Sequence, residues 1–348
     1  MSMNTVPERL AALRAAMKAN GVDVYLIPVG DPHSSEYLPD HYTSLTYFSG
    51  FHGENSNFVV TMTESAVWAD GRYFVQAEKE IAGTEIQLMR MGEPGVPTAE
   101  EYCGKVLPEG GTLGLCGLTA NCALVNSLKK ELEPKHGSIK TLFLEDELWV
   151  EGRPARPATP AWILPKEYAG FSPAEKLEQL RGKLKEQGCT AQLVGKLDNL
   201  AWLLNLRAMD IECTPYAMAY CYVTPNRAVL FIDQARVTPE AKAELEANGV
   251  TLADYDSILD GMAAEIEPQT VLAESATVNN PALTVKDAAD PLLAMKGVKN
   301  EVELAHLRES HLRDAVAMVR FQIELENRLA SGEQLTELTV DEILHKYR

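Results

Sequence analysis

The sequence lacks a hydrophobic run long enough to cross a membrane. No apolar stretch approaches the ~18 residues of a membrane span, and residues 1–21 predict an amphipathic helix without the apolar core of an export signal. Positive charge is also scarce, because 32 Lys and Arg face 50 Asp and Glu, giving a formal net charge of −18. This balance repels phosphate backbones and anionic headgroups, so we expect neither nucleic-acid nor membrane partners.

Paired cysteine motifs are absent as well. The six cysteines form no Cys-x-x-Cys pair and no Cys/His cluster at zinc spacing. Scattered cysteines in a chain of this length are typical of free thiols in a reducing cytosol. The sequence also has no glycine-rich phosphate loop, no G-x-S-x-G and no H-E-x-x-H. The commonest nucleotide, serine-hydrolase and zinc-protease chemistries are thereby excluded.

What the sequence does contain is a duplication. The length of 348 residues already predicts two or three domains. Residues 9–27 align with residues 176–194, and both segments predict a helix, a capping glycine and a strand. Three matches in one order indicate one domain used twice. The two further pairs are 45–51 with 200–206 and 56–70 with 217–233.

The domain organisation follows from this repeat and from one proline-rich segment. Each copy alternates strands with amphipathic helices, which predicts an α/β sandwich around a mixed sheet. Residues 151–160 hold three prolines and two arginines, a composition that forms neither helix nor central strand. We place a linker there and expect domains over residues 1–155 and 162–298.

Residues 299–348 are expected to begin a third domain. An apolar spacing of three and four residues predicts a long helix without a counterpart in the first copy, with a Glu309–Arg313 pair on another face. Thr339, with Glu342 three residues later, predicts the N-cap of a second helix. Because the sequence ends inside that second pattern, we expect the third domain to be truncated.

A cluster of possible metal ligands lies near the N-terminus. His33 and Glu36 are three residues apart, and His41 and His52 follow closely. The surrounding residues 30–42 are rich in turn formers, so their side chains need not share a face. A polar loop at the strand ends is the favoured interpretation.

Arg72 is the candidate binding residue. A strand is expected to end at Asp70, and Arg72 is expected to open the next helix. In one interpretation Asp70 caps that helix and Arg72 pairs on the surface; in the other the guanidinium is directed at a carboxylate or carbonyl of a ligand. The second copy keeps the acid as Asp233 but has no arginine two residues later, so the fold does not require one. This asymmetry strengthens the functional interpretation.

Six segments carry recognisable motifs: IPVGDPHSSEYL (27–38), YFSGF (47–51), WADGRYFVQA (68–77), LAWLLNLRAMDI (200–211), LFID (230–233) and KGVKNEVELAHLRESHLRDAVAM (296–318). Together with the duplication, they resemble the long, three-domain Xaa-Pro aminopeptidases (aminopeptidase P). Shorter relatives such as prolidase and creatinase carry one such N-terminal domain, so the doubled domain favours the long form. The resemblance implies two tandem ribonuclease H-like domains of the creatinase/prolidase N-terminal type, followed by the first helices of a truncated pita-bread domain.

The resemblance also implies an activity and a site. It implies an M24 metallopeptidase that removes an N-terminal residue followed by proline, with two divalent metal ions, usually manganese, in the catalytic domain. None of the family's metal ligands maps onto this chain. Arg72 maps as a substrate-binding residue, because residues 70–74 match the family motif in full. Arg207 and Asp210 match a second motif, for which we expect an intrachain ion pair.

We therefore expect the chain to be the non-catalytic N-terminal two-thirds of such an enzyme, helping to shape the substrate cleft and inactive by itself. The parent is expected to be a cytoplasmic homodimer that acts on peptides with proline at the second position. One alternative is a stand-alone creatinase-N-like binding or interaction module without enzymatic activity, which the coding sequence after Arg348 would decide. Another is an independent metal enzyme built on His33, Glu36, His41 and His52, which metal analysis would decide.

Overall fold

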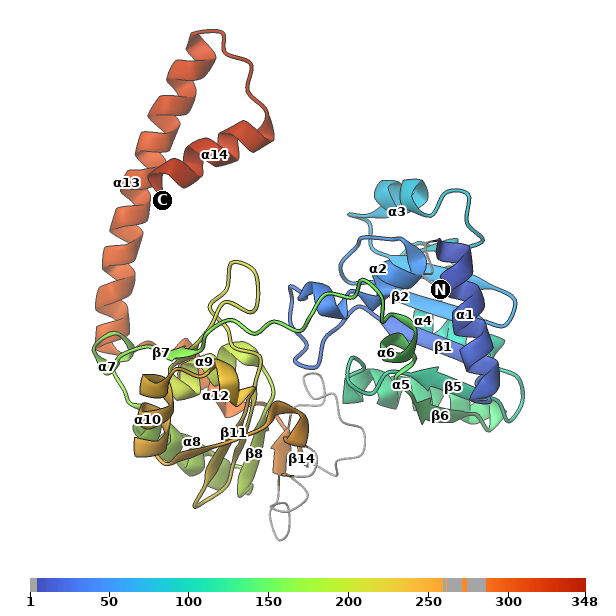
Figure 1. The fold of residues 1–348 in the computed structure, drawn as a ribbon, viewed down its shortest axis with the longest axis horizontal. Helices are drawn as coiled ribbons and strands as arrows, with labels where there is room; N and C mark the ends of the chain where they lie inside the picture. Colours follow the sequence, from blue (N-terminus) through green and yellow to red (C-terminus); the bar gives the residue numbers. More distant parts are fainter. Residues whose placement is uncertain (1–4, 259–260, 262–270, 274–285) are drawn as a thin grey trace.

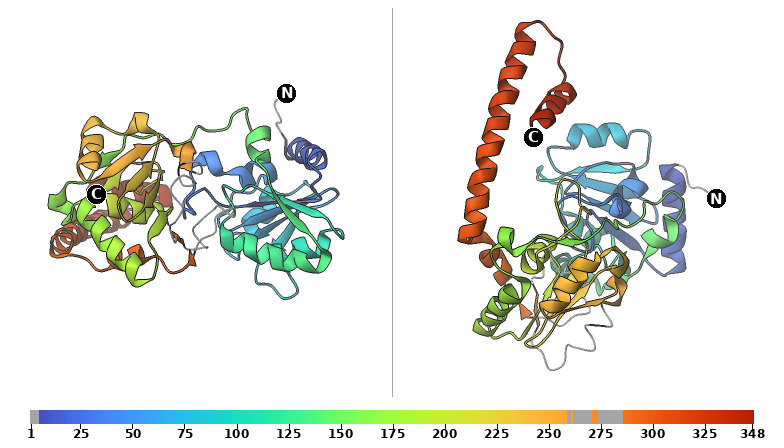
Figure 2. Two further views of the ribbon diagram at one scale, coloured as in Figure 1. Left: turned by 90° about the horizontal axis from the view of Figure 1, so that it is seen from below. Right: turned by 60° about the vertical axis from the view of Figure 1, so that its left-hand side comes forward.

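The structure, a computed structural model, describes residues 5–258, 261, 271–273 and 286–348. Two six-stranded mixed sheets lie side by side, each with helices packed against it, and a long helix rises from the second (Figure 1). Seen from below, the two sheets form separate bodies joined by the linker segment (Figure 2). The α/β fold with two tandem domains is confirmed. The boundaries predicted for the three domains stay predictions.

The first sheet has the strand order β4-β3-β2-β1-β5-β6. Its central strand β1 pairs antiparallel with β2 and parallel with β5, and the β2–β3 pair is an antiparallel hairpin. The strands are β1 (Val24–Pro28), β2 (Asn57–Thr61), β3 (Ser65–Ala69), β4 (Gln87–Arg90), β5 (Thr112–Leu115) and β6 (Ser138–Thr141).

Alternation along these strands produces two hydrophobic layers. Tyr25 and Ile27 belong to the core on one face of the sheet, whereas Val24 and Leu26 belong to the core on the other face. Because both faces are covered, the central strands are apolar throughout. The helices of the first domain are α1 (Val6–Ala19), α2 (Ser44–Ser49), α3 (Phe74–Glu80), α4 (Ala99–Val106), α5 (Cys122–Leu132) and α6 (Leu144–Leu148), with 3₁₀ turns η1 (Asp40–Tyr42) and η2 (Glu133–Lys135).

The second sheet repeats the first. Its order is β12-β11-β10-β8-β13-β14, and each neighbouring pair has the same parallel or antiparallel sense as its counterpart. Its strands are β8 (Ala191–Val194), β10 (Tyr220–Val223), β11 (Ala228–Phe231), β12 (Val250–Ala253), β13 (Val271–Ala273) and β14 (Lys286–Asp287). Around it lie α7 (Lys166–Ala169), α8 (Pro173–Glu186), α9 (Leu197–Leu204), α10 (Pro239–Ala247), α12 (Pro291–Gly297), η3 (Gln234–Arg236), η4 (Tyr255–Ser257) and a small ribbon of β7 (Trp162–Ile163) with β9 (Leu206–Arg207).

Single contacts recur in both copies. Arg14 on α1 donates from Nε to the carbonyl of Thr61 at 2.9 Å, and Arg181 on α8 donates from Nε to the carbonyl of Thr224 at 2.9 Å. Each arginine thus binds the end of the corresponding hairpin strand. This shared contact confirms that the helix–glycine–strand pattern reflects one domain used twice.

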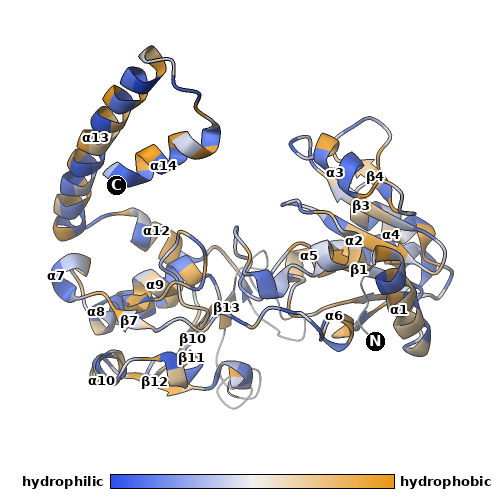
Figure 3. Cartoon of the chain, turned by 45° about the horizontal axis from the view of Figure 1, so that its top comes forward, coloured by the Kyte–Doolittle hydropathy of each residue, from blue (hydrophilic) through white to orange (hydrophobic). Residues whose placement is uncertain are grey.

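The third region consists of two helices, α13 (Glu301–Ala330) and α14 (Glu337–Tyr347). α13 is the long helix that the apolar spacing predicts, and it contains the Glu309–Arg313 pair at 2.5 Å. Apolar residues spaced along it alternate with charged ones (Figure 3). Leu312, Val319 and Ile323 are more than half exposed, so in the described chain α13 presents an apolar stripe to solvent.

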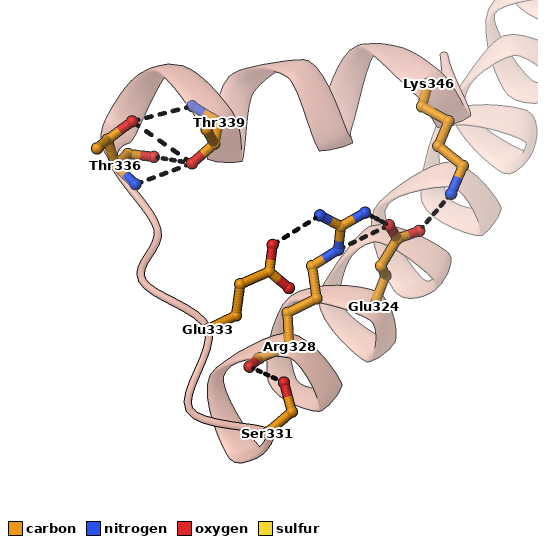
Figure 4. Close-up of polar contacts among 7 residues, drawn as sticks. All are labelled: Glu324, Arg328, Ser331, Glu333, Thr336, Thr339 and Lys346. Carbon is orange, nitrogen blue, oxygen red and sulfur yellow. Dashed lines mark hydrogen bonds and ion pairs between the residues drawn. The ribbon is translucent and has the colours of Figure 1, made fainter.

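The predicted start of α14 is wrong by three residues. Thr336, not Thr339, is the N-cap, and Thr339 occupies the third helical position of the capping box (Figure 4). Glu324 on α13 accepts hydrogen bonds from Arg328 at 2.5 Å and from Lys346 on α14 at 2.7 Å, which joins the two helices (Figure 4). Hydrogen bonds from Lys346, Tyr347 and Arg328 lower the pKa of Glu324 to about 2.

The base of α13 is attached to α7. Asn300 caps the helix by accepting from the backbone N–H of Glu303 at 2.9 Å, and its side-chain amide donates to the carbonyl of Ala169 at 3.0 Å. Gly170 has a φ of 77°, and a Cβ there would collide with the Asn300 side chain. Only glycine therefore fits between the end of α7 and the start of α13.

Among the described residues, no helix has both the length and the hydropathy needed to cross a bilayer. All six cysteines are free thiols, as the sequence predicts.

Replacing Gly188 by alanine should destabilise the second domain. Gly188 follows α8 with a φ of 69°, as Gly21 follows α1 with a φ of 67°, and a Cβ in this left-handed conformation costs about 1–2 kcal/mol. The matched control is Gly182→Ala inside α8, where a Cβ meets no atom within 4 Å and should stabilise the helix by about 0.5–1 kcal/mol. Urea unfolding of both variants measures the difference. Equal effects would contradict the backbone explanation.

Candidate functional site

Arg72 lies at the edge of the first domain, in the turn between β3 and α3. Asp70 accepts a hydrogen bond from the Arg72 backbone N–H at 2.9 Å and from its Nη2 at 2.7 Å. The Arg72 side chain is 63% exposed, and Nη1 lies 3.8 Å from Glu54. The hydrogen bonds from Arg72 lower the pKa of Asp70 to about 2. A carboxylate thus orients the guanidinium while leaving most of it in solvent.

The structure corrects the local prediction around Arg72. Helix α3 begins at Phe74, with Tyr73 in the N-cap position, so Arg72 does not open the helix. Asp70 caps the preceding turn instead, by binding the Arg72 backbone. In the second copy Asp233 makes the same turn with the N–H of Ala235 at 3.1 Å. The turn therefore forms without an arginine side chain.

The ion pair predicted between Arg207 and Asp210 is wrong. Asp210 pairs with Arg236, and both side chains are almost fully buried. Arg207 instead donates from Nη1 to the carbonyls of Ala201 and, at 3.0 Å, Leu206. The fold brings the 3₁₀ turn after β11 against the segment before β10, which places Arg236 beside Asp210. The nearness of Arg207 and Asp210 in the sequence does not reveal this pairing.

His33 connects the two domains. Its imidazole is buried, donates from Nδ1 to the carbonyl of Gly195 at 2.8 Å, and accepts at Nε2 from the hydroxyl of Tyr255 at 2.8 Å. The ring also packs on Tyr220, with centroids 4.3 Å apart. These partners satisfy both nitrogens of the neutral ring, and burial lowers the pKa of His33.

The other candidate metal ligands are not brought together with His33. His41 donates from Nδ1 to the carbonyl of Pro154 at 2.7 Å, and His52 is an exposed side chain 3.4 Å from Glu80. In the described part of the chain, no three His, Cys, Asp or Glu side chains are close enough to hold a metal ion. The four residues therefore do not form the metal site considered from the sequence.

Sequence reasoning missed the domain contact altogether. Tyr220 donates to the carbonyl of Pro32 at 3.1 Å, and Arg156 in the linker forms a two-pronged pair with Asp256 at 2.7 and 2.8 Å. These partners are separated by 100 or more residues, so spacing could not reveal them. A sequence signal for this contact is that residues 30–42 are rich in polar residues although they follow the apolar strand β1.

Comparison with known proteins divides the chain into the same two domains. Two models described as Creatinase/Prolidase N-terminal domain match residues 9–144 and 152–303. Aminopeptidase P2 of Arabidopsis thaliana is 34% identical over 99% of this chain and 54% of its own length. The probable Xaa-Pro aminopeptidase P of Sordaria macrospora is 34% identical over 100% of this chain and 60% of its own.

A solved structure agrees with these relatives. The crystal structure of X-prolyl aminopeptidase from Caenorhabditis elegans, described as a cytosolic enzyme with a di-nuclear active site, matches with a TM-score of 0.89 at 29% identity. The match covers 99% of this chain and 60% of that chain. The chain is thus a tandem of two creatinase/prolidase N-terminal domains with a helical extension. It belongs to the Creatinase/Prolidase N-terminal domain family and spans 54–60% of the length of these relatives.

The expectation that the chain is the non-catalytic N-terminal two-thirds of an aminopeptidase is wrong. The aminopeptidases match 99–100% of the chain, and the C. elegans enzyme superposes over 99% of it. Essentially every part of the chain therefore has a counterpart in these enzymes. The share of the relatives' length is also below two-thirds. The match to enzymes along the whole chain also argues against the alternative of a stand-alone binding module.

Acidification should weaken the protein through His33. Because burial lowers the folded-state pKa of His33, the unfolded chain takes up the proton first. The stability from neutral His33 is therefore fully present above about pH 6.5, the ordinary histidine value, and falls as the pH drops below it. Urea midpoints at pH 7.5, 6.5 and 5.5 should fall less for His33→Gln than for the parent chain.

The matched control is His345→Gln, because His345 is exposed on α14. Burial raises the pKa of Glu145 to about 7, which stabilises the folded state as the pH falls below that value. The comparison between variants removes this opposite contribution. An unchanged pH slope in His33→Gln would show that His33 does not couple protonation to the domain contact.

Proposed function

We propose that the protein is an Xaa-Pro aminopeptidase, which removes the N-terminal residue of peptides whose second residue is proline. The observation that supports this most is the match through 99% of the chain to X-prolyl aminopeptidase at a TM-score of 0.89. The relatives named aminopeptidase P cover the same span. Both α/β domains and α13 are included in the match.

In this proposal Arg72 binds and orients the peptide. Asp70 holds Nε and Nη2 of the guanidinium, and Nη1 has no hydrogen-bond partner in the described structure. A planar guanidinium suits a carbonyl or carboxylate of a peptide. Helix α3, which follows Arg72, lies on the same side of the two sheets as the α13–α14 pair (Figures 1 and 2).

Metal dependence is proposed for the protein as a whole, with manganese as the metal that family resemblance suggests. The residues that the structure describes do not fit a metal pair, because they offer no cluster of three or more donor side chains. No step is therefore assigned to a metal through these residues. Their contribution is to position Arg72 and to keep the two domains in contact.

The cellular context is part of the same proposal. Six free thiols suit a reducing cytosol, and the C. elegans relative is described as cytosolic. A homodimer is proposed from family resemblance alone, and light scattering of the purified protein measures it. The net charge of −18 disfavours nucleic acid as a partner.

The full-length gene product should hydrolyse a peptide with proline at the second position and should leave the matched alanine peptide intact. Treatment with a chelator should abolish the activity, and added manganese should restore it. Release of the N-terminal amino acid, followed by chromatography, measures both effects. Hydrolysis of both peptides at equal rates would contradict the proline specificity, and activity that survives metal removal would contradict metal dependence.

Arg72→Ala in the full-length gene product should lower kcat/KM about tenfold to a hundredfold, because a charge-assisted hydrogen bond contributes about 1.5–3 kcal/mol. Arg72→Lys should recover only part of this loss, since a point charge cannot reproduce the planar fork. Metal content should be unchanged in both variants.

The matched control for Arg72 is Arg90→Ala. Arg90 is also an exposed arginine of the first domain, ion-paired with Glu78, but it lies on β4. Its removal should leave kcat/KM unchanged. Unaltered kinetics in Arg72→Ala together with a lowered melting temperature would return Arg72 to a structural role.

A further inference from the structure

A pocket of about 650 Å³ lies between α7, α9, α12 and α13. We call it the α9–α13 pocket. Its walls combine aromatic and basic side chains, among them Tyr168, Lys176, Trp202, Arg207, Tyr216 and Lys299. It lies in the second domain and at the base of α13, whereas Arg72 lies in the first domain.

Two cations in this pocket form no direct ion pair with a carboxylate among the described residues. Lys176 is buried, and its Nζ donates to the carbonyl of Trp202 at 2.8 Å and to Oδ1 of Asn205 at 2.7 Å. Arg207 donates to the carbonyls of Ala201 and Leu206. In the part of the chain that the structure describes, neither cation forms an ion pair with a carboxylate. Both bind only neutral groups around the C-terminal end of α9.

The acids that line the pocket are already engaged. Asp198 pairs with Lys296. Glu303 accepts from the indole N–H of Trp202 at 3.1 Å, and its second oxygen accepts from the backbone N–H of Asn300 in the capping box of α13. These contacts leave Lys176 and Arg207 without a direct carboxylate acceptor.

Buried charges are normally paired, because removing an unpaired charge from water is strongly unfavourable. Glu303 acts on both cations without a direct contact, and the C-terminus of α9 adds only about half of one negative charge. Burial lowers the pKa of Lys176 to about 8 and lowers the pKa of Arg207. By contrast Arg236, a buried cation of the same domain, has Asp210 as its partner. The two cations of the α9–α13 pocket thus lack a hydrogen-bonded carboxylate of the kind that Arg236 has.

We propose that the α9–α13 pocket binds a carboxylate, held by Arg207 and Lys176, whose attached apolar or aromatic group packs on Trp202 and Tyr216. Arg207 can receive it through the guanidinium nitrogens that bind no carbonyl, and Lys176 has one N–H left besides its two hydrogen bonds, with Nζ lying over the Trp202 ring. The carboxylate can belong to a free organic acid or to an acidic side chain of a polypeptide. This ligand site is separate from the peptide-binding role of Arg72.

Isothermal titration of the chain with three probes tests the proposal. N-acetylphenylalanine supplies a free carboxylate, N-acetylphenylalanine amide lacks the charge, and acetyl-Phe-Glu-Phe-amide supplies only a side-chain carboxylate. At least one carboxylate probe should bind, the neutral amide should bind at least tenfold more weakly, and salt should weaken the binding. Binding of the first probe alone identifies a free acid as the ligand class, whereas binding of the third alone identifies an acidic polypeptide.

The variants assign the binding to the pocket. Arg207→Gln should weaken the carboxylate probe about tenfold or more, because it removes a charge-assisted hydrogen bond. Arg207→Lys keeps the charge and should weaken it less, which tests the site even if the glutamine variant folds poorly. The matched control is Arg181→Gln, since Arg181 also donates to main-chain carbonyls in this domain but lies outside the pocket. It should not change the affinity.

Three results would overturn the proposal: no binding of either carboxylate probe, equal affinity for acid and amide, or an affinity unaffected by both substitutions at Arg207. Circular dichroism and thermal unfolding of each variant confirm that the loss does not come from unfolding. Trp202 packs against Lys176, with Nζ 4.3 Å from the ring centroid, so its fluorescence gives a second readout of occupancy.

Discussion

The buried pair of Asp210 and Arg236 holds the end of the linker against the second domain. Asp210 also accepts from the hydroxyl of Thr159 at 2.6 Å and from the backbone N–H of Met218 at 2.7 Å. The end of the linker and the approach to β10 therefore meet at one carboxylate, where either charge left alone would be strongly unfavourable. Asp210 raises and Arg236 lowers the pKa of His33, so the pair presents little net charge to the domain contact.

Local patterns in the sequence predict the repeated elements well but not their contacts. The helix, glycine and strand of each copy follow from periodicity and from the left-handed conformation at Gly21 and Gly188. Helix starts are less well defined, because several residues before α3 and α14 can serve as caps. The partners of His33 and Asp210 could not be predicted, since they depend on how segments far apart in the chain pack together.

Three arginines show how little residue type alone determines a role. Arg236 is buried and paired with a carboxylate, and it stabilises the second domain. Arg72 is exposed and oriented by Asp70, so its charge is available to a passing group. Arg207 is largely enclosed but bound only to carbonyls. The sequence motif that contains Arg207 suggests a structural ion pair, and only the packing of α9 reveals that Arg207 has no such pair among the described residues.

The attachment of α13 has a mechanical consequence. A helix of 30 residues is about 45 Å long, and its base is fixed where Asn300 meets Ala169 and Gly170. A change of only about 10° in the direction of such a rod displaces its far end by about 8 Å. The location of α14, roughly eight helical turns away, thus depends on the direction in which α13 leaves the close contact between Asn300 and Gly170.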